Sequence, residues 1–191
     1  MTNRRWAAAD EAVVELLDEA NRIAASAFSA SADDARQPGL YAWFVDVEGA
    51  THLSEGALTV ILPGLVYAGQ AGAGASTATV GSRIKGNHLG GTITGSTFRM
   101  TLAALLARRL RLRDDGGRAL VGDGETRLTA WMQAHLSVAV VPEPDRTAVR
   151  LMEHTMLERI DPPLNLQGRP PSALRSAISA RRRRPIGGAA R

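Results

Sequence analysis

The spacing of apolar residues in the N-terminal half predicts one amphipathic helix followed by short strands. Apolar side chains recur at helical spacing from residue 6 to 28, with acidic residues between them, so we assign an N-terminal helix to residues 1–30. Residues 40–47, LYAWFVDV, alternate as expected for a strand with both faces partly buried. The apolar run at 58–69 contains a Pro63-Gly64 pair, which either divides a short strand or forms the bend of a hairpin.

The C-terminal half predicts helices interrupted by a single strand. In order, the pattern predicts an interrupted helical stretch at 80–89, a helix at 97–110 capped by Ser96, a helix at 125–136, a strand at 137–144 and a helix at 146–160 capped by Asp145. Helices and short strands thus alternate without the regular βαβ repeat of a doubly wound sheet. The pattern favours an α+β fold, or an irregular α/β fold with a small sheet.

Composition limits the classes of protein to which the chain can belong. Its 191 residues fit one domain, and no apolar run approaches the roughly 18 residues of a membrane helix. Acidic residues interrupt the stretch that would have to be apolar in a secretory signal, so we expect a cytoplasmic protein. The chain has no cysteine, which excludes disulfides, thiolate zinc sites and cysteine nucleophiles.

Positive charge is concentrated near the C-terminus. The formal net charge is +4, but residues 166–191 contain seven arginines and no acidic residue, so the remainder of the chain is net negative. The charge of the whole chain is therefore no argument for a basic surface on the folded body. We interpret residues 167–191 as a flexible basic tail, which is either solvated or in contact with a polyanion.

One carboxylate, Glu153, interrupts the apolar stripe of the 146–160 helix. A charge at such a position is costly unless it is paired, solvated or bound to a metal. Periodicity leaves two interpretations open: an edge residue that reaches solvent or an arginine, and a ligand of a hard cation. Asn165, which follows Pro162-Pro163, is either a turn former or a side chain that bridges loops.

Five elements in order along the chain resemble the GIY-YIG nuclease superfamily. Residues 39–41, GLY, are similar to the first tripeptide of that family, and residues 67–69, YAG, to the second. Arg83 is placed like the family's helix arginine, and Glu153 and Asn165 like its glutamate and asparagine. The order and spacing together are more specific than either tripeptide alone.

The resemblance covers residues 38–166 and implies a nuclease domain with a small, mainly antiparallel three-stranded sheet flanked by helices. It also implies metal-dependent endonuclease activity on a nucleic-acid phosphodiester, with DNA favoured over RNA. Glu153 would bind one Mg²⁺ or Mn²⁺, hard cations that need few protein ligands. Sequence specificity and oligomeric state stay open.

The family's catalytic roles then fall on particular side chains. Tyr41 would act on the nucleophilic water as general base, which at an ordinary pKa of about 10 requires a nearby cation. Tyr67 would orient the nucleophile or the phosphate, and Asn165 would tie the site together by hydrogen bonds. Arg83 would offer its planar fork of donors to the phosphate. Gly69 would let the chain turn away from the site, because it has no side chain.

The sequence departs from the family pattern at two positions. Gln70 follows the second tripeptide where many members have lysine, and it cannot neutralise a phosphate. Restriction-type members often carry a histidine four residues after the arginine, but here Asn87 takes that place and His88 follows. His88 is either an acid or base at the scissile phosphate, or a surface or structural histidine. Lys85 and Arg99 join Gln70 as candidates for substrate binding.

Two other functions stay open. A non-catalytic nucleic-acid-binding or regulatory module on the same fold would fit Gln70, the net negative body and the basic tail. A small-molecule enzyme is disfavoured, because GQAGAGAST at 69–77 has the glycines of a phosphate-binding loop but lacks its Lys-Ser/Thr ending.

Overall fold

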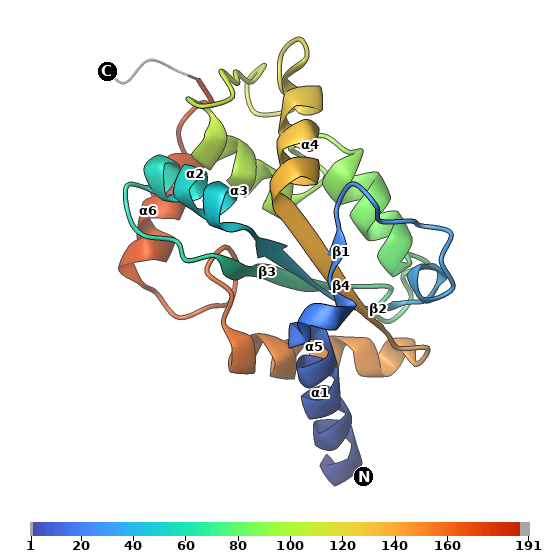
Figure 1. Cartoon of the computed structure of the whole chain (residues 1–191). Helices are drawn as coiled ribbons and strands as arrows, with labels where there is room; N and C mark the ends of the chain where they lie inside the picture. Colours follow the sequence, from blue (N-terminus) through green and yellow to red (C-terminus); the bar gives the residue numbers. More distant parts are fainter. Residues whose placement is uncertain (1, 188–191) are drawn as a thin grey trace.

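The computed structural model describes residues 2–187 and has a four-stranded antiparallel sheet at its centre (Figure 1). The strands are β1 (Ile23–Ala24), β2 (Gly39–Val45), β3 (Gly64–Ala71) and β4 (Leu136–Pro142). They are ordered β1-β4-β2-β3, so β2 is an inner strand and β3 forms one edge. The predicted α+β fold is confirmed, but the sheet has four strands instead of three, because the short β1 pairs with β4.

Helices cover both faces of the sheet (Figure 1). One layer consists of α1 (Thr2–Leu17) and α5 (Arg146–Ile160), and the other contains α2 (Val47–Ala57), α3 (Thr97–Leu106) and α6 (Ala173–Arg182). α4 (Gly124–His135) leads into β4, and a π-helix at Ser82–Leu89 replaces the interrupted helix expected at 80–89. Among residues 2–187, no helix is both long and apolar enough to cross a membrane.

The inner strand β2 is buried along its whole length because it lies between two strands and two helical layers. Leu40, Ala42 and Phe44 face the layer of α1 and α5. Tyr41 and Trp43 alternate with them and face the layer of α2 and α3. Strand alternation therefore carries the phenol of Tyr41 into the interior of the protein.

The N-terminal helix is shorter than the sequence pattern predicted. α1 ends at Leu17, and Asp18 then accepts a hydrogen bond from the Ala20 amide to cap a 3-10 turn. Ile23–Ala24 pairs with β4, and Phe28 joins the core. The prediction failed because apolar residues after position 17 matched a helical period although they belong to a strand and a buried loop.

The helix that follows β2 was absent from the sequence prediction. α2 follows β2 directly, and Asp46 caps it by accepting a hydrogen bond from the Gly49 amide. Gly49 and Gly56 are poor helix formers and obscured the helical pattern. Gly56 instead allows close packing, because a Cβ atom there would collide with the carbonyl oxygen of Leu105 in α3.

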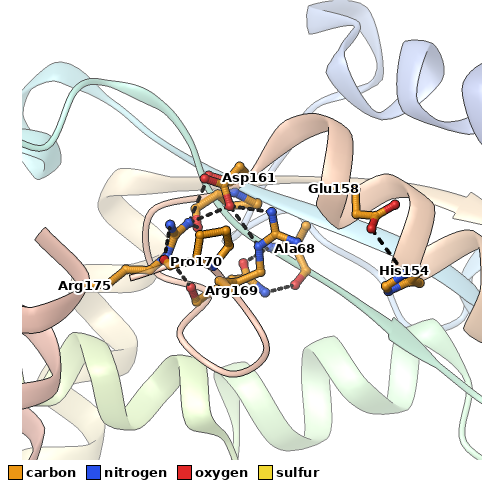
Figure 2. Close-up of polar contacts among 9 residues, drawn as sticks. Ala68, His154, Glu158, Asp161, Arg169, Pro170 and Arg175 are labelled. Carbon is orange, nitrogen blue, oxygen red and sulfur yellow. Dashed lines mark hydrogen bonds and ion pairs between the residues drawn. The ribbon is translucent and has the colours of Figure 1, made fainter. Parts of the chain in front are cut away.

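Residues 167–187 do not form the flexible tail that was expected, and the last four residues of that predicted tail lie outside the described part of the chain. Residues 173–182 form α6, in which Ile178 is fully buried. Arg169 and Arg175 converge on Asp161, at nitrogen–oxygen distances of 2.6 and 2.7 Å (Figure 2). Burial would raise the pKa of Asp161, but these hydrogen bonds outweigh it and lower that pKa. Two arginines of the basic segment therefore fix the chain after α5 in place.

Replacing Gly56 with alanine is expected to destabilise the fold although alanine is the better helix former. Helix propensity alone would add about 1 kcal/mol of stability. The methyl group must push α2 away from the backbone of α3, and overpacking costs up to about 3 kcal/mol. We expect the midpoint of thermal unfolding to fall by roughly 4–8 °C.

Gly86→Ala is the matched control, because nothing lies within 4 Å of a Cβ atom at that position. A Gly56→Ala protein that unfolds at the temperature of this control would contradict the close contact between α2 and α3.

Candidate active site

Tyr41 and Tyr67 lie on adjacent strands and face the same side of the sheet. The strand register pairs Tyr41 with Gly69 and Trp43 with Tyr67. Both tyrosines are buried, with 1% and 9% of their surface exposed. Strand pairing therefore brings together the two hydroxyl groups that the sequence analysis assigned to one site.

Gly69 makes room for the hydroxyl group of Tyr41. A Cβ atom at position 69 would lie 2.7 Å from Tyr41 Oη. The expectation that Gly69 permits a turn is wrong, because the chain stays in strand β3 as far as Ala71. Glycine is needed here for space across the strand pair.

A buried hydrogen-bond chain connects Tyr41 with the start of α3. His88 Nε2 lies 2.9 Å from Tyr41 Oη, and His88 Nδ1 lies 2.6 Å from Ser96 Oγ. Ser96 also accepts a hydrogen bond from the Arg99 amide as the N-cap of α3. The donors of Ser96 and His88 are all satisfied if Ser96 donates to Nδ1 and the Nε2 proton points to Tyr41.

The π-helix explains how His88 reaches Tyr41. Its hydrogen bonds run between residues five apart, as from the Gly90 amide to the Lys85 carbonyl (2.8 Å), and they widen the helical turn. Arg83 and His88 are five residues apart, so they lie about one turn apart and both interact with Tyr41. In an α-helix the same spacing would rotate the two side chains about 140° apart.

Burial controls the charge states of this cluster. It lowers the pKa of His88 to about 3, with a further effect of the nearby Arg83 and Arg99, so the imidazole is neutral. Burial raises the pKa of Tyr41, and Tyr67 adds to the effect, whereas Arg83 opposes it through its charge and a hydrogen bond. Without further positive charge, Tyr41 is therefore a phenol at neutral pH.

Arg83 stays charged inside the cluster. Burial alone would lower its pKa, but the two tyrosine hydroxyls and the nearby carboxylate outweigh burial and raise it. Arg83 Nε is buried and has no hydrogen-bond partner among residues 2–187. Part of its donor capacity is thus unused in the free protein.

Tyr67 lies between this cluster and a cavity of about 460 Å³ at the edge of β3. Its ring stacks on Phe98, with ring centroids 4.6 Å apart, and its hydroxyl lies 3.3 Å from Thr97 Oγ1. The rest of the cavity wall comes from α5, the segment after it, and Arg182 of α6. The cavity is therefore assembled from parts of the chain that are far apart in sequence.

Glu153 is the one carboxylate among the residues that line this cavity. Burial raises its pKa, and the charges of Arg150 and Arg83 partly offset that effect. No side chain among residues 8–187 forms an ion pair or hydrogen bond with it, so its oxygens stay available. Pairing of Glu153 with an arginine does not occur among the described residues, so two interpretations stay open: an edge residue that reaches solvent in the cavity, and a ligand of a hard cation that keeps most of its water.

Asn165 completes the free edge of β3. Its side chain accepts a hydrogen bond from the Ala68 amide (2.9 Å) and donates one to the Ala68 carbonyl (2.8 Å). The Leu164 amide donates to the Val66 carbonyl, and Arg175 donates to the Asn165 carbonyl. The side chain therefore bridges the loop after α5 and the strand that carries Tyr67.

A protein-family model covers most of the chain. The family model described as GIY-YIG catalytic domain matches residues 39–184. The chain belongs to the GIY-YIG family. Membership implies a nuclease-type function and a nucleic-acid substrate. No curated protein and no solved structure matches the chain. The family match extends beyond residue 166 and includes α6.

Two residues expected to bind substrate lie away from the GIY-YIG tyrosines. Gln70 follows Gly69 on the strand and so lies on the opposite face of the sheet, where its Oε1 accepts a hydrogen bond from the Ala73 amide. Lys85 is exposed, and its ammonium group lies 3.4 Å from the Phe28 carbonyl. The missing lysine at position 70 therefore removes no charge from the cluster around Tyr41.

Arg99 is the clearest correction to the expected site. Its side chain is fully buried, and its guanidinium donates to the Glu125 carboxylate (2.9 Å) and to the His88 carbonyl (3.0 Å). These partners and the Glu125 carbonyl occupy its guanidinium donors, which leaves none for a substrate phosphate. Arg99 instead supports the helix that carries His88, because its donors are used inside the core.

Four polar residues at the site were not predicted from the sequence to belong to it. Ser96 was predicted as a helix cap but not as a partner of His88, and Thr97, Arg150 and Arg182 were not considered. Arg150 lies three residues before Glu153 on α5, a spacing that places both on one helix face and was visible in the sequence.

We expect His88 to make the protein unusually sensitive to acid. Its pKa is about 3 in the fold and about 6.5 in an unfolded chain. Between these values the unfolded state binds more protons, so stability falls as the pH decreases, by at most about 1.4 kcal/mol per pH unit. The free energy of unfolding of His88→Asn should fall less steeply between pH 6.5 and 4 than that of the natural protein.

His154→Asn is the control, because His154 is exposed and pairs only with Glu158 on the same helix. Equal pH slopes for the natural protein and His88→Asn would show that His88 is not buried in its neutral form.

Proposed function

We propose that this chain is a metal-dependent endonuclease that hydrolyses nucleic-acid phosphodiester bonds, with DNA preferred over RNA. The observation that carries the proposal is the position of Tyr67. The Tyr67 ring packs against the buried cluster of Tyr41, Arg83 and His88. Tyr67 also lines the cavity that contains Glu153. This arrangement supports the proposal, because the groups that would serve as base, phosphate-binding guanidinium and metal ligand lie near one another, as phosphodiester hydrolysis requires. We also propose that the protein acts in the cytoplasm.

Glu153 would hold the divalent cation, Mg²⁺ or Mn²⁺. The fit rests on a half-buried carboxylate to which no donor in the described part of the chain is hydrogen-bonded. Among the described residues, no group of three or more His, Asp or Glu side chains could hold a metal, so a cation here would keep several waters. When bound, the cation supplies positive charge that makes a nearby water more acidic and neutralises the phosphate oxygens.

Tyr41 would take the proton of the attacking water. The water oxygen forms a bond to phosphorus, one P–O ester bond breaks, and the departing oxygen is protonated from solvent. Tyr41 must ionise before it can accept the proton, and burial opposes that step. The Arg83 guanidinium and, in the tautomer protonated at Nε2, His88 would both donate to Tyr41 Oη and so stabilise the phenolate.

Arg83 would also bind the scissile phosphate. Its charge is retained, and its unused donor capacity suits an anion that arrives with the substrate. Tyr67 would hold the phosphate or the water through its hydroxyl. Asn165 would act indirectly, because its side-chain amide holds the backbone of Ala68 next to Tyr67 in place.

A non-catalytic nucleic-acid-binding module remains the second candidate. It draws support from the net negative body of the chain and the arginines near its end. Gln70 no longer supports it, because this side chain lies across the sheet from Tyr41.

We expect the natural protein to cut plasmid or linear duplex DNA with Mg²⁺ or Mn²⁺, and Glu153→Gln to be slower by a factor on the order of 10²–10³. The measurement is the initial rate of cleavage on plasmid, linear duplex, single-stranded DNA and RNA, with each metal and with a chelator. Glu158→Gln on the same helix should cut within about twofold of the natural protein, because Glu158 is exposed and does not line the cavity.

Failure to cut any of these substrates, or equal rates for Glu153→Gln and Glu158→Gln, would overturn the proposal. Binding that weakens with salt, needs no metal and leads to no cleavage would support the second candidate.

A further inference from the structure

The cavity beside Tyr67 has a second positively charged wall, formed by Arg182 at the end of α6. The Arg182 side chain is half-buried and lines the cavity together with Tyr67 and Thr97. Its one hydrogen-bond partner among residues 8–187 is the thioether sulfur of Met100, at 3.4 Å, which is a weak acceptor. No carboxylate forms an ion pair with it within the described part of the chain. A partly buried guanidinium in this state leaves most of its donors available for an anion.

The positive charge of Arg182 opposes the rise of the Tyr67 pKa, and Arg182 is not among the arginines that shift the pKa of Glu153. Burial raises the pKa of Tyr67, and the charges of Arg83 and Arg182 oppose that rise. The arginines that shift the pKa of Glu153 are Arg150 and Arg83. Arg182 on α6 and Glu153 on α5 thus reach the same cavity from different helices, and Tyr67 of β3 also contributes to its lining.

The helix holds Arg182 in a defined position. Ser172 caps the start of α6, Arg175 clamps its first turn to the loop after α5, and Ile178 anchors its middle in the core. Arg182 is the last residue of this helix. The guanidinium is thus presented from a rigid element instead of a mobile tail, which lowers the entropy cost of binding an anion.

We propose that Arg182 binds a phosphate group of the nucleic acid next to the scissile one, and so sets the position of the strand across Tyr67. A single strand carries one phosphate per about 3.4 Å of duplex axis, so a strand whose scissile phosphate meets Arg83 must place further negative charge along the cavity. Of the two arginines that line the cavity, Arg150 lies on the same helix as Glu153, whereas Arg182 comes from α6 and has no acidic partner among the described residues. The positive end of the α3 helix dipole, at Thr97, adds to the attraction.

This inference rests on the proposed nuclease function but has its own measurement. The full chain is compared with Arg182→Gln, Arg182→Lys and Arg184→Gln. Arg184 is the matched control, since it is exposed, belongs to the same arginine run and does not line this cavity. Affinity for a fluorescent DNA duplex is measured from 50 to 300 mM salt in a Glu153→Gln background, and cleavage kinetics are measured with Glu153 intact.

Arg182→Gln should weaken duplex binding roughly three- to tenfold at moderate salt and reduce the slope of log Kd against log salt by about 0.9. In cleavage, KM should rise by a similar factor and kcat should change little. Arg182→Lys should keep the slope, because it keeps the charge, but bind more weakly than arginine, since it loses the planar fork. Arg184→Gln should keep both the affinity and the KM of the natural protein.

If Arg182→Gln and Arg184→Gln behave alike while the natural protein cuts DNA, the role of Arg182 is wrong and the proposed function stands. If the protein binds DNA in an Arg182-dependent way but does not cut it, the phosphate contact stands and the proposed function fails. If it neither binds nor cuts, both are wrong. Thermal unfolding shows whether each variant is folded. If Arg182→Gln does not fold, Arg182→Lys is compared with Arg184→Lys instead. Weaker DNA binding by Arg182→Lys supports the phosphate contact, and equal binding overturns it.

Discussion

The hydrogen bond between Tyr41 Oη and His88 Nε2 is the contact on which the rest of the site depends. Both groups are buried, and an unpaired phenol or imidazole in the interior would cost about 1–3 kcal/mol. Gly69 leaves space for the hydroxyl on one side, and Ser96 satisfies the far nitrogen of the ring. The contact therefore fixes how the sheet, the π-helix and the start of α3 fit together.

The same contact explains an unusual feature of the backbone. A π-helix is less favourable than an α-helix and persists where surrounding contacts support it. Here it brings two residues five apart, Arg83 and His88, to the same phenol. Arg99 holds this arrangement by donating to the His88 carbonyl from inside the core. A departure from regular helix geometry thus places a neutral imidazole and a charged guanidinium around one oxygen.

Much of the fold followed from local patterns, and the parts that did not have identifiable causes. Alternation predicted β2 and β4, and helical spacing with an acidic cap predicted α5. α2 was not predicted because Gly56 weakens the helical pattern, although this glycine is what allows the close contact with α3. α6 was not predicted because its arginines suggested a solvated tail, although Arg175 and Ile178 are buried.

The candidate site was likewise predicted only in part. Family spacing placed Tyr41, Tyr67 and Glu153, but only the strand register and the π-helix could show that Gln70 lies across the sheet and that Arg99 supports His88. The central claim is that Tyr41 and His88 act as one unit on the attacking water. A double-mutant cycle with Tyr41→Phe and His88→Asn tests it through kcat/KM for DNA cleavage. The account predicts that the double variant is no slower than Tyr41→Phe alone, whereas losses that multiply would show that the two residues act independently.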